Sequence, residues 1–284
     1  MAEHIEHLKD GIYEKVMSKE FADRLMEAIE AKKVWAERDD TDAYEATGYL
    51  SSYLEKLIRL CLKDIADRNT EAVLSDEIEL TNQLVEMLVE RLPDLGHGHS
   101  VVKNQFLLKS LEHVANKTSP RKWEYPDTSL TKSFLFTNSH NDTSMVSELR
   151  KEIMSADRID FLVSFIRFSG LALLLPYLRD FTNKGGHLRV ITTTYMGATD
   201  PKAVVELAKL PNTEIHISYN VKETRLHAKS YIFNRDSQFS TAYIGSSNLS
   251  HAAIAEGLEW NMKITEQDMP SIMEKMTATF ETYW

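Results

Sequence analysis

The first third of the chain spaces its apolar residues as on the buried face of a helix. Between Ile5 and about Ser110 they recur every three or four positions. Examples are Leu54, Leu57, Ile58, Cys61, Leu62 and Ile65, and then Leu84, Met87, Leu88 and Leu92. Side chains at this spacing lie on one side of a helix and pack against a neighbour. The pattern predicts an all-helical domain over residues 1–117.

Polar residues that can cap helices mark where these helices begin. The candidates are Ser18, Thr41 or Asp42, and Ser75 or Asp76, each followed by a glutamate within the first turn. Cys61 is the only cysteine, so no internal disulfide can form. It lies on the apolar side of its helix, which predicts a buried structural thiol.

The pattern changes after residues 118–129, where two prolines and short polar residues predict a linker. Short β-rich runs then alternate with helical stretches. We expect strands at 132–138, 158–166, 187–195, 213–219, 227–233, 240–245 and 257–264, and helices at 145–156, 171–181, 201–210 and 267–283. This alternation predicts an α/β domain over residues 130–284, with helices on the faces of a sheet.

No apolar run reaches the roughly 18 residues that span a bilayer, because Pro176 interrupts the longest one. The charged N-terminus lacks the apolar stretch of a signal peptide, so we expect a cytoplasmic protein without a membrane partner. The net charge is −10, yet residues 101–250 hold 19 lysines and arginines against 14 acidic residues. A mildly basic surface tolerates a polyanion, although this excess is too small to indicate one.

The stretch with the strongest chemical signal is His227-Ala-Lys229, followed by Gly245-Ser-Ser-Asn248. Residues i and i+2 of a strand point to the same face, so His227 and Lys229 project together and Ala228 turns to the apolar side. A lysine and an amide donor can hold phosphate oxygens while an imidazole lies within reach of phosphorus.

A second strand over residues 242–245 can lie beside the first. It delivers Ser246 and Asn248 at its carboxyl end, and Gly245 permits close approach of the backbone to a phosphate. Glu259 follows on a third predicted strand. The spacing therefore predicts that one edge of the sheet carries these side chains.

These residues resemble the HxK(x4)D…GSxN signature of the phospholipase D superfamily, and Glu259 falls where that family has an acid. Asn234 departs from the signature, since it stands in the place of the aspartate. The resemblance implies a mixed sheet flanked by helices and the following site. The expected catalytic residues are His227, Lys229, Asn248 and Glu259, and the supporting or substrate-binding residues are Ser246, Asn234, Gly245, Thr193, Tyr195 and Arg167.

Residues 130–284 also resemble the phospholipase D-like modules at the N-terminus of certain bacterial superfamily 2 helicases, and related modules of metal-independent restriction endonucleases. The chain has no GxxxxGK[ST] phosphate loop and hence no motor of its own. We expect either a fragment of a helicase-linked nuclease or a stand-alone module, with a helicase motor as a possible partner.

The family uses two such motifs per site, one histidine as nucleophile and one as general acid, through a phosphohistidine. His187, His216 and His251 do not sit in an HxK frame. The resemblance therefore implies a homodimer that cleaves DNA, with two His227 side chains facing each other and no metal or cofactor. In that arrangement Glu259 accepts a hydrogen bond from a His227 ring and orients it.

Several alternatives remain open at the level of sequence. A non-catalytic nucleic-acid-binding and dimerisation module of a helicase is the second hypothesis, favoured by Asn234 and the modest basic charge, and phospholipid chemistry is a third. Asn234 can support the site or simply form a turn. The remaining residues have two interpretations each. Thr193, Tyr195 and Arg167 line a substrate groove or form hydrogen bonds within turns. His97 and His99 lie in a flexible loop or form a pair of metal ligands, and Trp260 and Tyr243 belong to the core or stack on a base.

Overall fold

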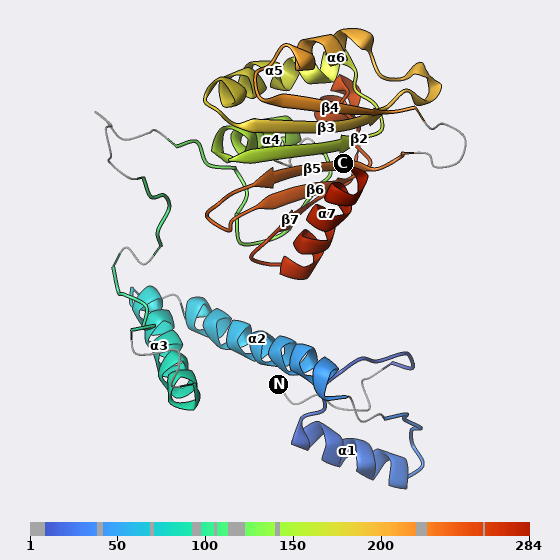
Figure 1. Cartoon of the computed structure of the whole chain (residues 1–284). Coiled ribbons are helices and arrows are strands. Elements are labelled where there is room, and N and C mark those ends of the chain that lie inside the picture. The colour runs from blue at the N-terminus through green and yellow to red at the C-terminus, as the bar shows by residue number, and fades with distance from the viewer. Residues whose placement is uncertain are drawn as a thin grey trace. The chain divides into compact units, whose positions relative to one another are not determined.

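The computed structural model describes residues 9–38, 42–68, 71–92, 98–104, 107–112, 123–139, 143–219, 226–257 and 259–284 (Figure 1). The chain divides into two compact units, Met1–Leu111 and Glu112–Trp284. The expected boundaries at residues 117 and 129 stay predictions.

The first unit consists of helices α1 (Lys19–Glu30), α2 (Ala43–Asp67) and α3 (Val73–Arg91), as the N-terminal pattern predicted. Ser18 caps α1, since its hydroxyl accepts a hydrogen bond from the backbone N–H of Phe21. Asp42 does the same for α2 through the N–H of Glu45. The prediction at Ser75 or Asp76 is wrong, because α3 begins two residues earlier and no side chain caps it.

This first unit buries few of the apolar residues that its pattern places on one helix face. Among its described residues, Leu25 and Ile78 are the buried apolar side chains. Cys61 is exposed, which contradicts the predicted buried thiol. The following apolar residues of α2 and α3 are also exposed: Leu50, Leu54, Leu57, Ile58, Leu60, Leu74, Met87 and Leu88.

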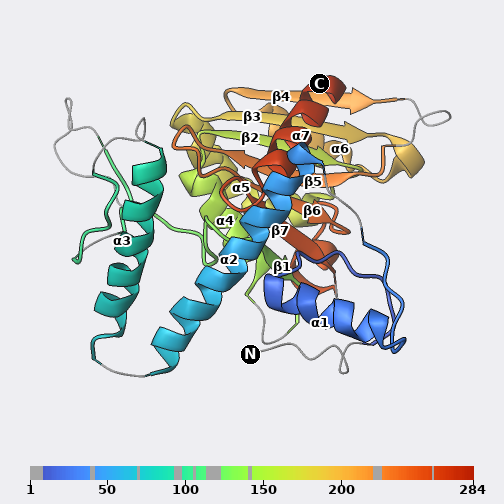
Figure 2. The same ribbon diagram turned by 90° about the horizontal axis from the view of Figure 1, so that it is seen from below.

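The second unit contains a seven-stranded mixed sheet in the order β1-β7-β6-β5-β2-β3-β4 (Figure 2). Strands β2, β3 and β4 are parallel, and every other neighbouring pair is antiparallel. The predicted α/β fold is therefore confirmed. The bounds are β1 (Phe134–Phe136), β2 (Arg158–Val163), β3 (His187–Thr193), β4 (Thr213–Ser218), β5 (Lys229–Asn234), β6 (Thr241–Gly245) and β7 (Asn261–Thr265).

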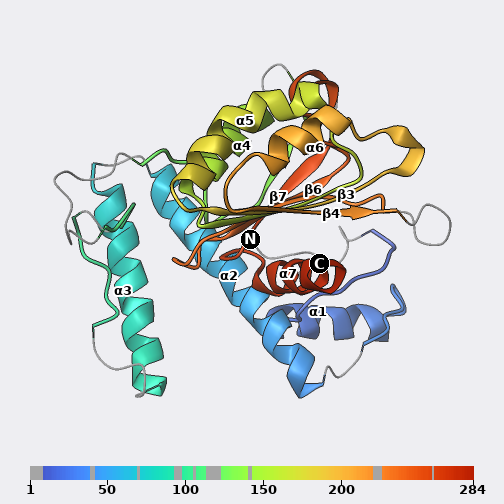
Figure 3. The ribbon, with the colours of Figure 1, turned by 45° about the horizontal axis from the view of Figure 1, so that its top comes forward.

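Helices cover both faces of the sheet (Figure 3). On one face lie α4 (Met145–Ser155), α5 (Phe168–Asn183) and α6 (Pro201–Ala208), and on the other lies α7 (Pro270–Tyr283). A short 3-10 turn (Tyr195–Gly197) follows β3, and a π-helical turn (Ala252–Glu256) precedes β7. Among the described residues, none of the helices is long and apolar enough to cross a membrane.

Side chains alternate between the two faces, as strand geometry requires. Phe161 of β2 and Tyr231 of β5 are paired across the strands and belong to the core under α4 and α5. Leu162 and Ile232 point the other way and pack with Phe280 of α7. The two cores fix which face each residue of β2 and β5 presents.

The strand directions bring several strand ends to one edge of the sheet. Val163 at the end of β2 pairs with Lys229 at the start of β5, and Gly245 at the end of β6 pairs with Asn261 at the start of β7. Because β3 runs parallel to β2, its carboxyl end reaches the same edge. We call this edge, from β7 to β3, the site edge.

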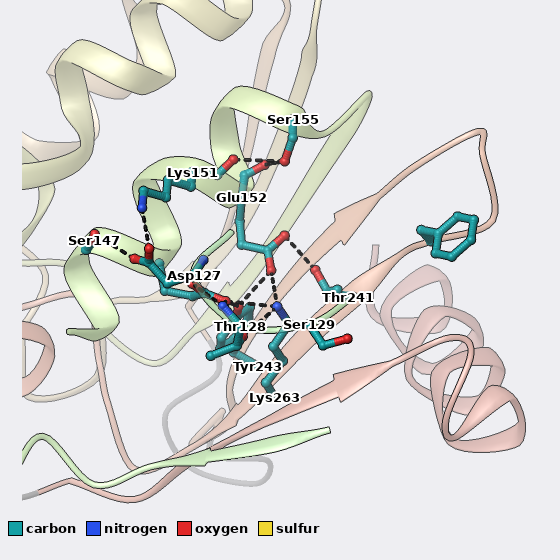
Figure 4. Close-up of polar contacts among 12 residues, drawn as sticks. Asp127, Thr128, Ser129, Ser147, Lys151, Glu152, Ser155, Thr241, Tyr243 and Lys263 are labelled. Atoms are coloured by element: carbon teal, nitrogen blue, oxygen red, sulfur yellow. Dashed lines mark hydrogen bonds and ion pairs between the residues drawn. The ribbon is translucent and has the colours of Figure 1, made fainter. Parts of the chain in front are cut away.

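A fully buried group of charges lies between α4 and the sheet (Figure 4). Glu148 and Glu152 stand one turn apart on α4 and face Lys263 of β7, whose Nζ is 2.9 Å from a carboxylate oxygen of each. Arg235, just after β5, pairs with Glu152. The Tyr243 hydroxyl donates to Glu152 at 2.7 Å. Two carboxylates and two cations thus compensate one another where unpaired charges would be costly.

The same group of charges holds part of the segment that the sequence assigned to a linker. The backbone N–H of Asp127 donates to Glu148 at 2.6 Å, and the Lys263 ammonium donates to the Thr128 hydroxyl at 2.9 Å. Asp127 also pairs with Lys151 on α4 (Figure 4). Hydrogen bonds and an ion pair therefore hold residues 127 and 128 against α4 and β7.

Replacing Glu152 with glutamine tests this group of charges. Burial alone would raise the pKa of Glu152, but Arg235 and Lys263 outweigh it and lower the pKa to about 2. An ionised carboxylate of lowered pKa stabilises the fold above its ordinary pKa of 4.5, and that contribution is lost as the pH falls toward 2. Near neutral pH we expect Glu152→Gln to lower the free energy of unfolding by roughly 3 kcal/mol in denaturant titrations.

The difference between the two proteins should shrink steadily from pH 4.5 toward pH 2. Asp180→Asn is the matched control, because it removes an exposed carboxylate paired with Lys184 on α5. Its expected cost is below about 0.5 kcal/mol. Equal costs for the two variants would contradict a stabilising role for the buried charges.

Candidate functional site

His227 and Lys229 meet at the site edge. Lys229 is the first residue of β5 and is buried, whereas His227 is exposed and precedes the strand. The Lys229 Nζ lies 3.1 Å from Nδ1 and 3.2 Å from Nε2 of His227, and it donates to the His227 carbonyl at 2.7 Å. The structure therefore places an imidazole and an ammonium group side by side.

Ala228 does not turn to the apolar side, as the strand pattern predicted, but is exposed. Its carbonyl accepts hydrogen bonds from the backbone N–H of Ser164 at 3.1 Å and from the Ser164 hydroxyl at 3.2 Å. The residue before β5 is thus tied to the end of β2. This contact orients the backbone from which His227 projects.

The Lys229 ammonium group is buried and lies near the negative charge of Glu259. Burial lowers the pKa of Lys229, and the nearby negative charge of Glu259 opposes part of that shift. Among the described residues, no carboxylate forms an ion pair with this ammonium group, and Glu259 makes no hydrogen bond to His227. A partly desolvated cation at the surface is suited to an anion such as a phosphate.

Asn248 lies at the site edge with one amide group engaged. It is buried, and its Oδ1 accepts a hydrogen bond at 3.2 Å from the N–H of Phe165, two residues after β2. Its Nδ2 makes no hydrogen bond to any described residue. Because the oxygen is held by the backbone, the amide nitrogen is directed and remains available as a donor.

The loop that carries Asn248 is held by Asn261 of β7, which the sequence did not single out. Asn261 is buried, and its Nδ2 donates to the Ser247 hydroxyl at 2.8 Å. The Ser247 hydroxyl donates in turn to the Ala253 carbonyl at 3.1 Å. The backbone of Ser246 bonds to the Trp260 carbonyl at 3.2 Å. The sequence could have indicated Asn261, because it lies two residues after Glu259 in the same predicted strand over residues 257–264.

A glycine is needed at position 245 because of the neighbouring strand, whereas the sequence suggested that it allows close approach of a phosphate. A Cβ at this position would lie 2.1 Å from the Trp260 carbonyl oxygen and 2.6 Å from Oδ1 of Asn261. Glycine is therefore required for the close approach of β6 and β7.

Asn234 lies at the opposite end of β5 from Lys229, so its side chain does not contact the residues at the site edge. Five residues of strand separate the two by roughly 17 Å. The Asn234 Nδ2 donates at 2.8 Å to Oδ2 of Asp160, a buried carboxylate whose Oδ1 accepts from Arg189 at 2.7 Å. Asn234 is thus part of a polar network on the α7 face.

The other expected residues are mostly engaged locally. Thr193 is buried, and its hydroxyl donates to the Ser218 carbonyl at 3.0 Å and accepts from the Tyr195 N–H at 3.1 Å. Arg167 pairs with Asp200 at 3.2 Å. These contacts match the turn interpretation better than the groove interpretation for Thr193 and Arg167.

The two aromatic residues with open interpretations differ from each other. Tyr243 is fully buried, as predicted for a core residue. Trp260 is 68% exposed, so its assignment to the core is wrong. His97 lies outside the described residues, and no group of three His, Cys, Asp or Glu side chains that could hold a metal ion occurs in the described part of the chain.

The sequence of residues 149–284 matches the family described as "Cardiolipin synthase, PLD-like domain". Residues 149–284 are therefore similar to a phospholipase D-like domain. This match includes both motifs at the site edge and starts within α4. No curated protein sequence matches the chain.

Solved structures resemble this chain over different shares of its length. NucT from Helicobacter pylori is 18% identical, with a TM-score of 0.43, over 53% of this chain and 94% of that one. Nuc from Salmonella typhimurium, a phospholipase D family member, is 16% identical, with a TM-score of 0.40, over 54% and 93%. TrmBL2, an archaeal chromatin protein, is 12% identical, with a TM-score of 0.35, over 93% and 80%. TM-scores this low carry no residue-level correspondence.

An aspartate at position 234, as in the superfamily signature, should destabilise the second unit. Asn234→Asp would replace the amide donor by a second carboxylate 2.8 Å from the buried Asp160. Like charges at this distance raise the pKa of one carboxyl, so the penalty is present at neutral pH and fades as that carboxyl is protonated on acidification. We expect a loss of about 1–3 kcal/mol in the free energy of unfolding at pH 7.

Denaturant titrations against the unaltered protein at the same pH would measure this loss. The control introduces Asn234→Asp together with Asp160→Asn, which removes the like charge. The change at position 234 should then cost clearly less. An undiminished penalty in the double variant would mean that repulsion between the two carboxylates is not the cause.

Proposed function

We propose that the phospholipase D-like domain is a metal-independent phosphodiesterase that cleaves DNA through a phosphohistidine intermediate. The observation that carries this proposal is the juxtaposition at the site edge of the His227 imidazole with the buried Lys229 ammonium group. The Asn248 amide nitrogen adds a directed donor at the same edge. Together they offer a nucleophile and two groups for phosphate oxygens.

The chemistry needs two histidines. In the first step the His227 ring nitrogen forms a bond to phosphorus, the bond between phosphorus and the leaving oxygen breaks, and a second imidazolium protonates that oxygen. In the second step the now neutral imidazole takes a proton from water, which attacks phosphorus and releases His227. Lys229 and Asn248 bind the non-bridging oxygens throughout.

We assign the second histidine to His227 of another copy of the chain, because the combined HxK…GSxN motif occurs once in this sequence. A two-fold axis through the site then gives each active centre one nucleophile and one acid. In this arrangement Glu259, whose charge already acts on Lys229, is the expected hydrogen-bond acceptor for a His227 ring.

DNA as the substrate rests on the resemblance of residues 130–284 to helicase-linked and restriction modules. A helicase motor or a restriction system is the corresponding partner. The non-catalytic alternative was favoured by Asn234 and by the modest basic charge. The hydrogen bond from Asn234 to Asp160, away from the site edge, supports the catalytic proposal over this alternative.

Replacing His227 with alanine tests the proposal. We expect the purified protein to cleave DNA in excess EDTA, and His227→Ala to lower the rate at least a thousandfold, since the nucleophile and the acid are both lost. His187→Ala is the control, because His187 begins β3 at the opposite edge and pairs with Glu214. It should retain the full rate.

Quenching a reaction of 32P-labelled DNA with detergent at alkaline pH should trap a base-stable, acid-labile phosphoryl adduct on His187→Ala and none on His227→Ala. Lys229→Ala should weaken binding of the substrate as well as its cleavage, because it removes a charge on the phosphate. Undiminished cleavage by His227→Ala would overturn the mechanism.

A further inference from the structure

An uncovered row of apolar side chains crosses the sheet next to the site edge. Leu135 of β1 pairs with Met262 of β7, and Met262 pairs with Ile244 of β6. Residues directly opposite one another in antiparallel strands point to the same face. Trp260 lies two residues before Met262 and continues the row toward the site edge. We call these four residues the apolar strip.

The apolar strip lies on the face that carries α7. Ala242 of β6 and Ile264 of β7 pair with each other and are buried, and Ala242 packs in the cluster that contains Phe280 of α7. Ile244 and Met262 stand two residues from these positions and so point to the same face. The helix therefore covers the neighbouring row but stops short of the strip.

The exposure of the strip is large for apolar side chains on a sheet. Trp260 is 68% exposed, Ile244 46%, Leu135 45% and Met262 37%. A contiguous exposed patch of this kind marks a surface that another molecule covers, whereas scattered single residues do not. Tryptophan and methionine are also enriched at the centres of protein interfaces.

We propose that the apolar strip is the surface on which a second copy of this chain docks. This inference rests on the proposed function, in which a site is complete only with His227 from another copy. The strip leads directly to that site. The Trp260 carbonyl accepts from the Ser246 N–H at 3.2 Å, and the Trp260 N–H donates to the Ser246 hydroxyl at 3.3 Å, in the motif that holds Asn248.

The composition of the strip favours a protein over nucleic acid as its occupant. Its four side chains supply no positive charge, whereas contacts to a phosphate backbone depend on lysine and arginine. Lys263, the nearest cation along β7, points to the opposite face and is fully buried against Glu148 and Glu152. Two copies of an apolar strip, related by a two-fold axis, can bury one another.

Sedimentation velocity of the full-length chain over a series of concentrations tests the surface. We expect the unaltered protein to form dimers and Ile244→Asp to raise the dissociation constant at least tenfold, because a carboxylate would be buried at the centre of the interface. Val205→Asp is the matched control. Val205 is 52% exposed on α6, which lies on the other face of the sheet, so its replacement should leave the dissociation constant unchanged.

A second variant guards against a loss of folding in Ile244→Asp. Ile244→Thr combined with Met262→Thr keeps residues that favour strands and removes apolar surface. It should keep the far-ultraviolet circular dichroism of the unaltered protein and still weaken the dimer. Dimerisation of either strip variant as in the unaltered protein overturns the proposal, and so does a chain that stays monomeric at all concentrations.

The outcomes separate this inference from the proposed function. A dimer that depends on the strip, combined with DNA cleavage by His227→Ala, leaves the surface intact and overturns the mechanism. Cleavage that depends on His227, combined with a dimer indifferent to the strip, does the reverse. Normal dimers with weakened binding of an oligonucleotide would assign the strip to nucleic acid and overturn the docking surface.

Discussion

The register of β5 against β2 is the constraint on which the site depends. Val163 opposite Lys229 places the start of β5 beside the end of β2. A shift by one residue would turn Lys229 to the α7 face and remove Tyr231 and Phe233 from the core that they fill under α4 and α5. The burial of these two aromatic residues therefore holds the lysine where an imidazole and an amide donor can share a ligand with it.

Polar contacts anchor the far end of the same strand. Asn234 binds Asp160 on the α7 face, and Arg235, the next residue, binds Glu152 on the opposite face. Neighbouring residues thus fasten β5 to networks on both sides of the sheet. The aspartate of the superfamily signature is replaced by a residue that can donate to a carboxylate, which suits the presence of Asp160.

The two units use their apolar residues in different ways. The second unit buries large side chains on both faces of its sheet and leaves one contiguous row uncovered beside the site edge. In the first unit the apolar side of α2 is exposed over much of its length. A helix with such an exposed stripe gains most of its stability from packing against a partner. In the second unit, the same physical argument leads from Trp260, Met262, Ile244 and Leu135 to a second copy.

Much of this protein follows from its sequence alone. The alternation of β-rich and helical runs was enough to predict the sheet and its helices, because the side-chain periods of strands (2) and helices (3.6) are local properties of the sequence. The motif around His227, Lys229 and Asn248 sufficed to predict that these residues gather at one edge of the sheet. Tertiary structure alone decided what depends on contacts between distant segments. It showed that Asn234 meets Asp160 far from Lys229, that Glu148 and Glu152 meet Lys263, and that Trp260 lies outside the core, since each depends on which strands become neighbours and how far a helix extends over them.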